Sequence, residues 1–296
     1  MDIKAIFLGI AFAFMWSSAF TSAHIIVASA PPLTALSLRF LISGLVGIAL
    51  AKVLGQSWSL TKGQWVGTFI FGFFQNALYL GLNFVAMQTI DASLAAIIAS
   101  TMPLLVALTG WLIFKERINF FGVLGLIAGV SGVVLIMGTR LNGGVDVFGL
   151  ILCGIGVFAL AFASLAVRGA SSGGNILMIV GLQMLVGSFV LAAVALPTES
   201  LDFSLTRSVI LAFLYTTFVP GLGATWVWFV LVGRIGAVRA STFHFLNPFF
   251  GVLVAYIILG ESIGIMDLIG VVIITSGILM VQLSKSNEAV ISLVKK

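Results

Sequence analysis

Long apolar runs alternate with short polar segments along the whole chain. Each run holds about twenty residues, which is the length that an α-helix needs to cross the hydrocarbon core of a bilayer. The polar segments contain most of the charges and many of the turn-forming residues. Dividing the chain at these segments predicts ten membrane-spanning helices, over residues 5–27, 33–54, 64–86, 92–114, 119–137, 147–168, 175–196, 207–232, 238–259 and 265–283.

The first apolar run is interpreted as a retained helix rather than a cleaved leader. It extends from Ala5 to Val27, whereas the apolar part of a signal peptide has about 7 to 15 residues. Pro31 and Pro32 end it, and a second span follows directly.

Composition agrees with a membrane protein and excludes several other classes. Of the 296 residues, 61% are apolar and 8% are charged, against about 25% charged in soluble domains. Ten spans would use nearly the whole chain, so no soluble domain is expected. The net charge of +5 does not indicate nucleic-acid binding, because no span carries a continuous basic face. Cys153 is the only cysteine, which excludes an intrachain disulfide and a cysteine-built metal site.

The basic residues predict the orientation of the spans. With a cytoplasmic N-terminus, eleven of the fourteen Lys and Arg residues fall on the inner side, while Arg140 and Arg207 fall outside and Arg39 lies within a span. The eleven are Lys4, Lys52, Lys62, Lys115, Arg117, Arg168, Arg234, Arg239, Lys285, Lys295 and Lys296. Because basic residues concentrate on the cytoplasmic side of membrane proteins, both termini are predicted to be cytoplasmic.

An internal repeat appears when the chain is compared with itself at a shift of 145 residues. The shift superposes Pro103 on Pro248, Glu116 on Glu261, Gly125 on Gly270 and Gly132 on Gly277. We therefore expect a first repeat over 1–140 and a second over 141–296 that ends in a short cytoplasmic tail. A repeat of five spans is odd in number, so the second copy enters the membrane from the opposite side.

The predicted fold is therefore an all-α membrane protein, with ten transmembrane helices forming two inverted five-helix repeats around a central cavity. Inverted repeats are typical of transporters, because two similar halves can exchange conformations and open the cavity to alternate sides. The alternative is a duplication that has no role in the mechanism.

Polar side chains within the third span form one candidate binding surface. Gln75, Tyr79 and Asn83 follow one another at intervals of four residues, which places them on one face of a regular helix. Such a face is expected to line a cavity and to hydrogen-bond a substrate. The alternative is hydrogen bonding between helices.

A second group of candidates precedes prolines at equivalent positions of the two repeats. Ser100 and Thr101 precede Pro103, and His244 and Asn247 precede Pro248. Each proline lacks a backbone donor and crowds the carbonyl four residues before it. Where a transmembrane helix is broken in this way, neighbouring polar groups or cavity water must satisfy the backbone.

These breaks are also candidate hinges. We expect Pro103 and Pro248, together with Pro220 in span eight, to allow bending, although a transmembrane proline can also form a static kink. The counterpart of Pro220 in the first repeat is Gln75, so the repeat is imperfect at that position.

Arg39 and Trp16 complete the set of candidate substrate-binding residues. Arg39 lies about seven residues into span two. It is expected to extend to the outer interface, to pair with a substrate carboxylate, or to bind a carbonyl at a broken helix. Trp16 lies near the middle of span one, where an aromatic wall is expected. Trp228 lies near the cytoplasmic end of its span and is not favoured, because tryptophan is common at membrane interfaces.

Several of these motifs together resemble the EamA-type exporters of the drug/metabolite transporter superfamily. They are Met15-Trp16-Ser17-Ser18-Ala19-Phe20, Leu38-Arg39-Phe40, the segment from Pro103 to Glu116 and its second copy from Pro248 to Glu261. The resemblance covers the full chain, and within the family it is to the bacterial aromatic amino-acid exporters of the YddG type. Many relatives have Gly after the tryptophan of span one and Lys eight residues beyond that tryptophan, where this chain has Ser17 and His24. The resemblance implies an exporter of the bacterial inner membrane that uses no cofactor.

The inventory of charges narrows the substrate and the mechanism. Every Asp and Glu falls in a predicted loop or at the end of a span, so no carboxylate is placed to bind sodium or to relay protons at mid-membrane. His244 and His24 are the only side chains in or beside spans that titrate near neutral pH. Phosphorylated substrates would need more embedded bases than Arg39, and cationic drugs would favour an embedded acid. A zwitterionic or neutral solute with an apolar part remains.

The preferred function is therefore facilitated export of small zwitterionic metabolites, above all aromatic or neutral amino acids, by alternating access. A proton-coupled exporter of the same superfamily and a channel-like pore are the alternatives. An enzyme is not expected, because no nucleophile with a base and no metal cluster occurs at membrane depth. The expected partners are a small-molecule substrate and the lipid bilayer.

Overall fold

The computed structural model describes residues 3–112, 115, 118–166 and 175–294. This part of the chain is helical and contains no strand. Ten of its helical spans are long and apolar enough to cross a membrane: Ile3–Val27, Pro32–Val53, Lys62–Ala86, Ala92–Leu112, Phe120–Asn142, Val147–Ala166, Ile176–Thr198, Arg207–Ile235, Arg239–Leu259 and Ile265–Ser284. The predicted all-α fold with ten spans is confirmed. Glu116, Arg117 and Arg168, which entered the repeat and orientation arguments, lie outside the described residues.

Four of the ten spans are interrupted. The unbroken ones are α1 (Ile3–Val27), α2 (Pro32–Val53), α7 (Phe120–Asn142), α8 (Val147–Ala166), α9 (Ile176–Thr198) and α14 (Ile265–Val294). The interrupted ones are α3 (Lys62–Phe71), η1 (Gly72–Tyr79) and α4 (Leu80–Ala86); α5 (Ala92–Ser100) and α6 (Met102–Leu112); α10 (Arg207–Thr216), η2 (Thr217–Gly223) and α11 (Ala224–Ile235); and α12 (Ala237–Ser241), η3 (Thr242–Leu246) and α13 (Asn247–Leu259). The segments η1 and η2 are π-helical, and η3 is a 3₁₀ helix.

The interruptions fall at equivalent positions of the two sequence halves. The π-helical segments begin at Gly72 and Thr217, which are 145 residues apart, and α6 and α13 begin at Met102 and Asn247 with the same separation. The start signals of α3 and α10 also correspond. Thr61 accepts a hydrogen bond from the amide of Gln64, and Thr206 accepts one from the amide of Val209. Hydroxyl caps of this kind satisfy backbone donors that the first turn leaves free.

The chain divides into two compact units, each of which contains segments from both sequence halves. The first comprises residues 1–21, 90–147 and 223–296, and the second comprises residues 22–89 and 148–222.

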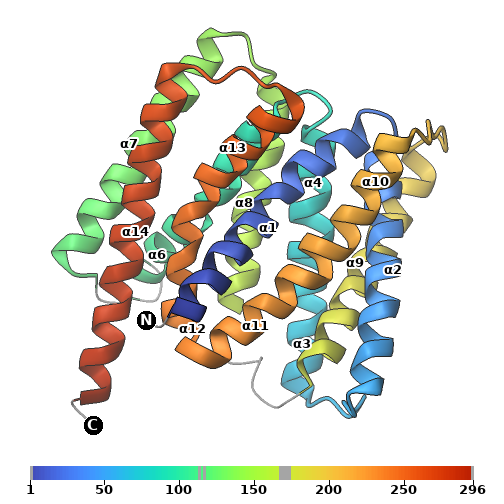
Figure 1. The fold of residues 1–296 in the computed structure, drawn as a ribbon, viewed down its shortest axis with the longest axis horizontal. Coiled ribbons are helices and arrows are strands. Elements are labelled where there is room, and N and C mark those ends of the chain that lie inside the picture. Colours follow the sequence, from blue (N-terminus) through green and yellow to red (C-terminus); the bar gives the residue numbers. More distant parts are fainter. Residues whose placement is uncertain (1–2, 113–114, 116–117, 167–174, 295–296) are drawn as a thin grey trace. The chain divides into compact units, whose positions relative to one another are not determined.

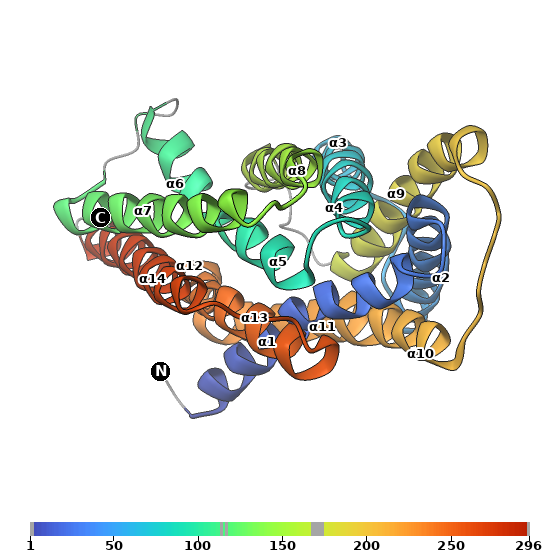
Figure 2. The ribbon, with the colours of Figure 1, turned by 90° about the horizontal axis from the view of Figure 1, so that it is seen from above.

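In the first unit, α7 and α14 lie side by side (Figures 1 and 2). Gly125 approaches Gly277, and Gly132 approaches Gly270, so the two helices run antiparallel. A β-carbon on Gly277 would lie 2.5 Å from the amide nitrogen of Gly129. Glycine is therefore required at this contact, because small residues let membrane helices approach to backbone distance.

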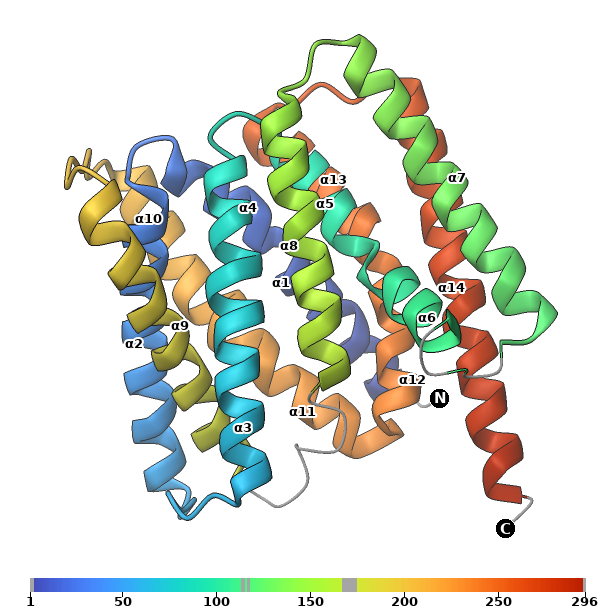
Figure 3. The same cartoon turned by 180° about the vertical axis from the view of Figure 1, so that it is seen from behind.

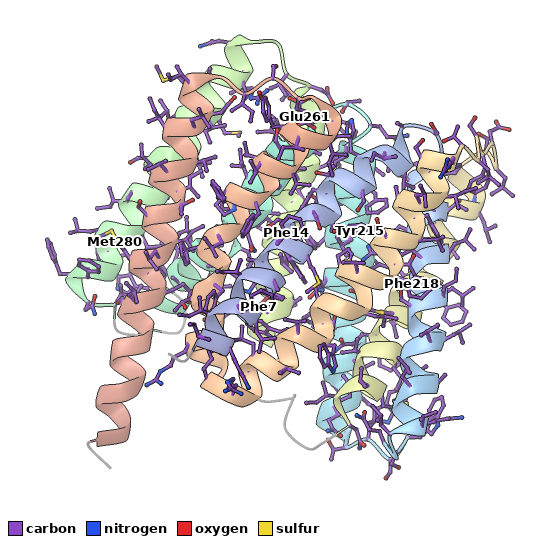
Figure 4. The ribbon with its side chains drawn as sticks, in the orientation of Figure 1. Phe7, Phe14, Tyr215, Phe218, Glu261 and Met280 are labelled. Carbon is purple, nitrogen blue, oxygen red and sulfur yellow. The ribbon has the colours of Figure 1, made fainter. Side chains whose placement is uncertain are left out.

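Charged side chains join three elements at one end of this unit. Arg140, in the last turn of α7, lies 2.9 Å from Asp91 before α5 and 2.9 Å from Asp267 in the first turn of α14. Glu261 follows α13 (Figure 4) and accepts hydrogen bonds from the amides of Ala92 and Ser93 at the start of α5. A carboxylate at this position also complements the helix dipole. The fifth span was predicted to end at residue 137, but it continues to Asn142, and this extension brings Arg140 to its two partners.

In the second unit, α2 and α9 lie side by side (Figure 3) and run antiparallel. Gly44 meets Gly181 at backbone distance. Ser37 and Ser188 each donate a hydroxyl hydrogen bond of 2.9 Å to the carbonyl oxygen of the other. Glu199 accepts hydrogen bonds from the amides of Leu33 and Thr34 and so caps the start of α2, as Glu261 caps the start of α5.

Large apolar side chains remain exposed along the spans. Phe7 and Phe14 on α1, and Phe218 in η2, are 74%, 43% and 43% exposed (Figure 4). A water-soluble protein rarely shows so much apolar surface. With ten spans of sufficient length, this surface identifies a multi-pass membrane protein.

Candidate functional site

An aromatic cluster with two polar members forms within the first unit. Its residues, which we call the aromatic box, are Phe12, Trp16, Trp228, His244 and Asn247. The rings of Phe12 and Trp228 lie 4.8 Å apart between centroids. The centroid of the His244 imidazole lies 5.3 Å from that of Phe12, 5.5 Å from that of Trp228 and 6.4 Å from that of Trp16, and its plane is perpendicular to the rings of Phe12 and Trp16. Edge-to-face contacts at these distances are favourable between aromatic rings.

Four helical segments supply these side chains. Phe12 and Trp16 are four residues apart on α1, so they share one face of that helix. Trp228 comes from α11, and His244 comes from the 3₁₀ segment η3. Asn247 opens α13, directly before Pro248.

The break at Pro248 explains the conformation around His244. Because proline has no N–H, the carbonyl of His244 loses the donor that it would have in an α-helix. The amide of Asn247 donates to this carbonyl instead, which tightens the chain into a 3₁₀ turn. The freed carbonyl was expected to need an outside partner, and it is satisfied within its own turn.

The polar atoms of the box are unequally satisfied. Asn247 Nδ2 lies 3.0 Å from His244 Nδ1, and Ser17 Oγ donates to the backbone carbonyl of Asn247 at 3.1 Å. The side-chain oxygen of Asn247 is buried and has no hydrogen-bond partner among the described residues. Trp16, Trp228 and His244 remain partly exposed, whereas Phe12 and Asn247 are buried.

Two members of the box were not among the predicted site residues. Trp228 was not favoured because it lies near the end of its span, seven residues before Ile235. Its partner Phe12 lies nine residues after Ile3, so it is at a similar distance from a helix end. Trp228 thus contacts the same imidazole as Trp16, although it lies near the end of its span. Phe12 is one of 25 phenylalanines, and no pattern in the sequence distinguishes it.

The other break in this unit uses its hydroxyls internally. Ser100 Oγ donates to the carbonyl of Ala96, and Thr101 Oγ1 donates to that of Ile98, both at 2.6 Å. These bonds satisfy carbonyls next to the break that precedes Pro103. The described contacts therefore show Ser100 and Thr101 stabilising the broken helix, and no hydrogen bond in the described residues joins either hydroxyl to the aromatic box.

The predicted polar face of span three lies in the second unit. Asn83 Nδ2 donates to the carbonyl of Tyr79 at 2.8 Å, and the thiol of Cys153 donates to Asn83 Oδ1 at 3.4 Å. Tyr79 is only 1% exposed. The expected spacing assumed a regular α-helix, whereas Gln75 and Tyr79 lie in a π-helical segment, so the rotation between them differs from the α-helical value.

Arg39 is also buried in the second unit, with 6% of its surface exposed. Its Nε donates to the carbonyl of Thr216 at 3.2 Å, and Ser43 donates to the next carbonyl, that of Thr217. Thr216 lies four residues before Pro220, which has no N–H to offer it. Of the three roles expected for Arg39, the structure contains the bond to a carbonyl at a broken helix.

No group of three or more His, Cys, Asp or Glu side chains within the described ranges could hold a metal ion. The aromatic box therefore offers rings, an imidazole and an amide, and this chemistry suits reversible binding.

Comparison with known proteins identifies the family. The pattern of the EamA-like transporter family matches residues 3–138 and again residues 147–283. The chain belongs to the EamA-like transporter family. The two matches begin 144 residues apart and end 145 residues apart. EamA membership, ten spans and the names of relatives indicate a transporter.

The relatives cover nearly the whole chain. "Uncharacterized transporter YvbV" of Bacillus subtilis is 28% identical over 93% of this chain and 90% of its own length. "Probable amino-acid metabolite efflux pump" of Salmonella typhimurium is 25% identical over 94% of each chain. A solved structure titled "Crystal structure of protein" has a TM-score of 0.69 at 22% identity, over 96% of this chain and 98% of that chain. At that identity, the match shows a shared fold only. The narrower resemblance to YddG-type exporters stays a prediction.

Proposed function

We propose that this EamA protein exports small zwitterionic metabolites, chiefly aromatic or neutral amino acids, across the inner membrane of a bacterium, with both termini in the cytoplasm. The observation that carries the proposal is the aromatic box, whose rings suit an apolar side chain and whose imidazole and amide suit a polar head group. The relative named as an amino-acid metabolite efflux pump supports the substrate class. The protein performs no covalent chemistry in this proposal.

The mechanism proposed is alternating access by two inverted repeats. Under the 145-residue shift, α14 corresponds to α7, and these helices are antiparallel. The contact of Gly125 with Gly277 then becomes the contact of Gly270 with Gly132, so the pair is reciprocal. Reciprocal contacts are what a twofold relation between copies produces. An inverted relation of this kind supports exchange of conformations between the halves.

The breaks before Pro103 and Pro248 and the π-helical segment around Pro220 serve as bending points in this mechanism. Each already departs from α-helical geometry, so a change of angle there disrupts fewer regular hydrogen bonds than it would in an unbroken helix.

Facilitated transport is proposed in preference to proton coupling. Among the described carboxylates, Glu199 and Glu261 cap helices and Asp91 and Asp267 pair with Arg140, and none of the four is in the aromatic box. His244 is the one titratable member of the box, and it has a neutral partner in Asn247. A proton-coupled exporter would require His244 to change charge in every transport cycle.

Counterflow in proteoliposomes tests the proposal. Liposomes preloaded with unlabelled phenylalanine should accumulate labelled phenylalanine transiently and without an imposed ion gradient. His244→Gln should retain substantial exchange, and His24→Gln serves as the matched control on the other histidine. Absence of saturable counterflow with a panel of amino acids would reject the substrate class. Flux without counterflow would indicate a channel-like pore. Uphill accumulation driven by a pH gradient, lost in His244→Gln while downhill exchange survives, would establish proton coupling instead.

A further inference from the structure

The side-chain oxygen of Asn247 is an acceptor without a donor. The residue is only 6% exposed, and its oxygen has no partner among the described residues. Leaving such a group unpaired in a buried position is unfavourable. Because Asn247 Nδ2 is already engaged with His244, the amide has its acceptor available for a ligand.

The tryptophan rings beside His244, the hydrogen-bond partner of this amide, favour a cation. Trp16 and Trp228 are partly exposed, and the face of a tryptophan attracts an ammonium group within about 6 Å. Asn247 Nδ2 is a donor, so its contact with His244 Nδ1 requires the tautomer that leaves this nitrogen unprotonated, and in that tautomer the imidazole is neutral. The box therefore contains no positive charge that would repel a cation.

The start of α13 has fewer free donors for an anion than an ordinary helix N-terminus. Helix N-termini bind anions through free backbone N–H groups. Here the N–H of Asn247 is bonded to the carbonyl of His244, and Pro248 has none. Two of the first positions of the helix therefore have no free N–H to offer a carboxylate.

We propose that the aromatic box holds the ammonium group of the transported solute, with Asn247 Oδ1 accepting its N–H and with Trp16 and Trp228 facing its charge. This inference rests on the proposed function and makes the primary amine, rather than the carboxylate, the group that the box selects. The oxygen is closed to solvent in this conformation, so the amine reaches it when the box opens during the transport cycle. The neutral box binds the cation without an embedded acid.

Two ligands that each carry the same phenyl ring distinguish an ammonium site from a carboxylate site. 2-Phenylethylamine carries the ammonium without the carboxylate, and 3-phenylpropanoate carries the carboxylate without the ammonium. Equilibrium binding of each radiolabelled compound to the purified full chain should favour the amine at least about tenfold, as expected for a charge-assisted hydrogen bond. Asn247→Leu should weaken amine binding about tenfold, and Asn247→Asp should strengthen it.

The neighbouring tryptophans provide a matched control. Trp226 lies on the same helix as Trp228, two residues away, and is 60% exposed. Trp228→Leu should weaken amine binding several-fold, and Trp226→Leu should leave it unchanged. This pair also decides the question if Asn247→Leu does not fold.

Three results would overturn the inference: equal or tighter binding of the acid, equal effects of the two tryptophan substitutions, or binding of neither compound. Tighter binding of the acid would mean that the amide presents its N–H to the ligand. Phenylalanine counterflow in the same preparation keeps the two proposals apart. Counterflow without amine selectivity would retain the export function and reject the ammonium site. Amine selectivity without counterflow of any amino acid would retain the ammonium site and reject the export of amino acids.

Discussion

Single polar residues inside the spans of this EamA protein are held by specific acceptors. Arg39 illustrates this, because a buried guanidinium normally requires a compensating charge. Among the described residues its hydrogen bond goes to the carbonyl of Thr216, and its guanidinium lies 5.1 Å from the centroid of the Phe40 ring. Pro220 has no N–H to donate to this carbonyl. Arg39 therefore stabilises the π-helical segment η2.

A lysine at position 39 tests this role. Arg39→Lys keeps the charge but loses the planar Nε–H that reaches Thr216. We expect the melting temperature of the detergent-solubilised protein to fall by several degrees, and the KM for the transported solute to stay within about twofold of the wild-type value. Arg207→Lys, at the exposed start of α10, is the matched control and should change neither. A raised KM with an unchanged melting temperature would instead assign Arg39 to substrate binding.

At the scale of elements, glycine contacts decide which helices pair. In α7 and α14 the backbones come closest at Gly125 and Gly277: a β-carbon on Gly125 would meet the carbonyl oxygen of Gly277, and one on Gly277 would meet the amide nitrogen of Gly129 and the carbonyl oxygen of Gly125. Rigid backbone cannot yield to an added methyl group as a flexible side chain can. Not all glycines of α7 have this function, because a β-carbon on Gly138 would meet nothing within 4 Å.

The same substitution at two glycines should therefore have opposite effects. Gly277→Ala places a methyl group against the backbone of α7 and should lower the free energy of unfolding by about 1 to 3 kcal/mol. Gly138→Ala meets open space and should raise it by up to about 1 kcal/mol, because alanine restricts the unfolded chain and favours the helix. Unfolding in mixed micelles measures both. Destabilisation of equal size at the two positions would contradict the packing argument.

At the scale of the whole molecule, the compact units do not follow the sequence halves. The first unit takes α5 and α7 from the first half and α13 and α14 from the second, and the second unit takes α2 from the first half and α9 from the second. Corresponding helices thus pair with each other inside one unit. The division of the chain into two sequence halves therefore differs from its division into two compact units.

The orientation of the chain can be tested with introduced cysteines. Cys153→Ser gives a variant without cysteine. Single cysteines can then be introduced at three informative positions: at Asn142, at Ser200 after α9, and at Ser57 between α2 and α3. Cys153 is buried, and serine can keep its hydrogen bond to Asn83. If both termini are cytoplasmic, an impermeant thiol reagent added to intact cells should label the first two positions and not Ser57. Labelling at Ser57 in sealed cells would reverse the assigned orientation.

The sequence alone determined the span count and most boundaries, because hydrocarbon imposes a minimum length and an apolar composition on every helix. It also located the breaks at Pro103, Pro220 and Pro248, since proline lacks a donor wherever it stands. Trp16 was a candidate because it lies near the middle of span one, and His244 and Asn247 were candidates because they precede Pro248 within a span. These features depend only on local chemistry.

Only the tertiary structure decided which of those residues meet. Trp228 and Phe12 belong to the aromatic box because α11 packs against α1. Arg140 reaches Asp91 and Asp267 because α7 extends beyond its predicted end. Arg39 received a backbone acceptor from a helix far away in sequence. Such contacts depend on how helices pack at glycine positions and on π-helical turns, which rotate every later side chain. An apolar sequence carries little record of that rotation, because apolar side chains occur on every face of these helices.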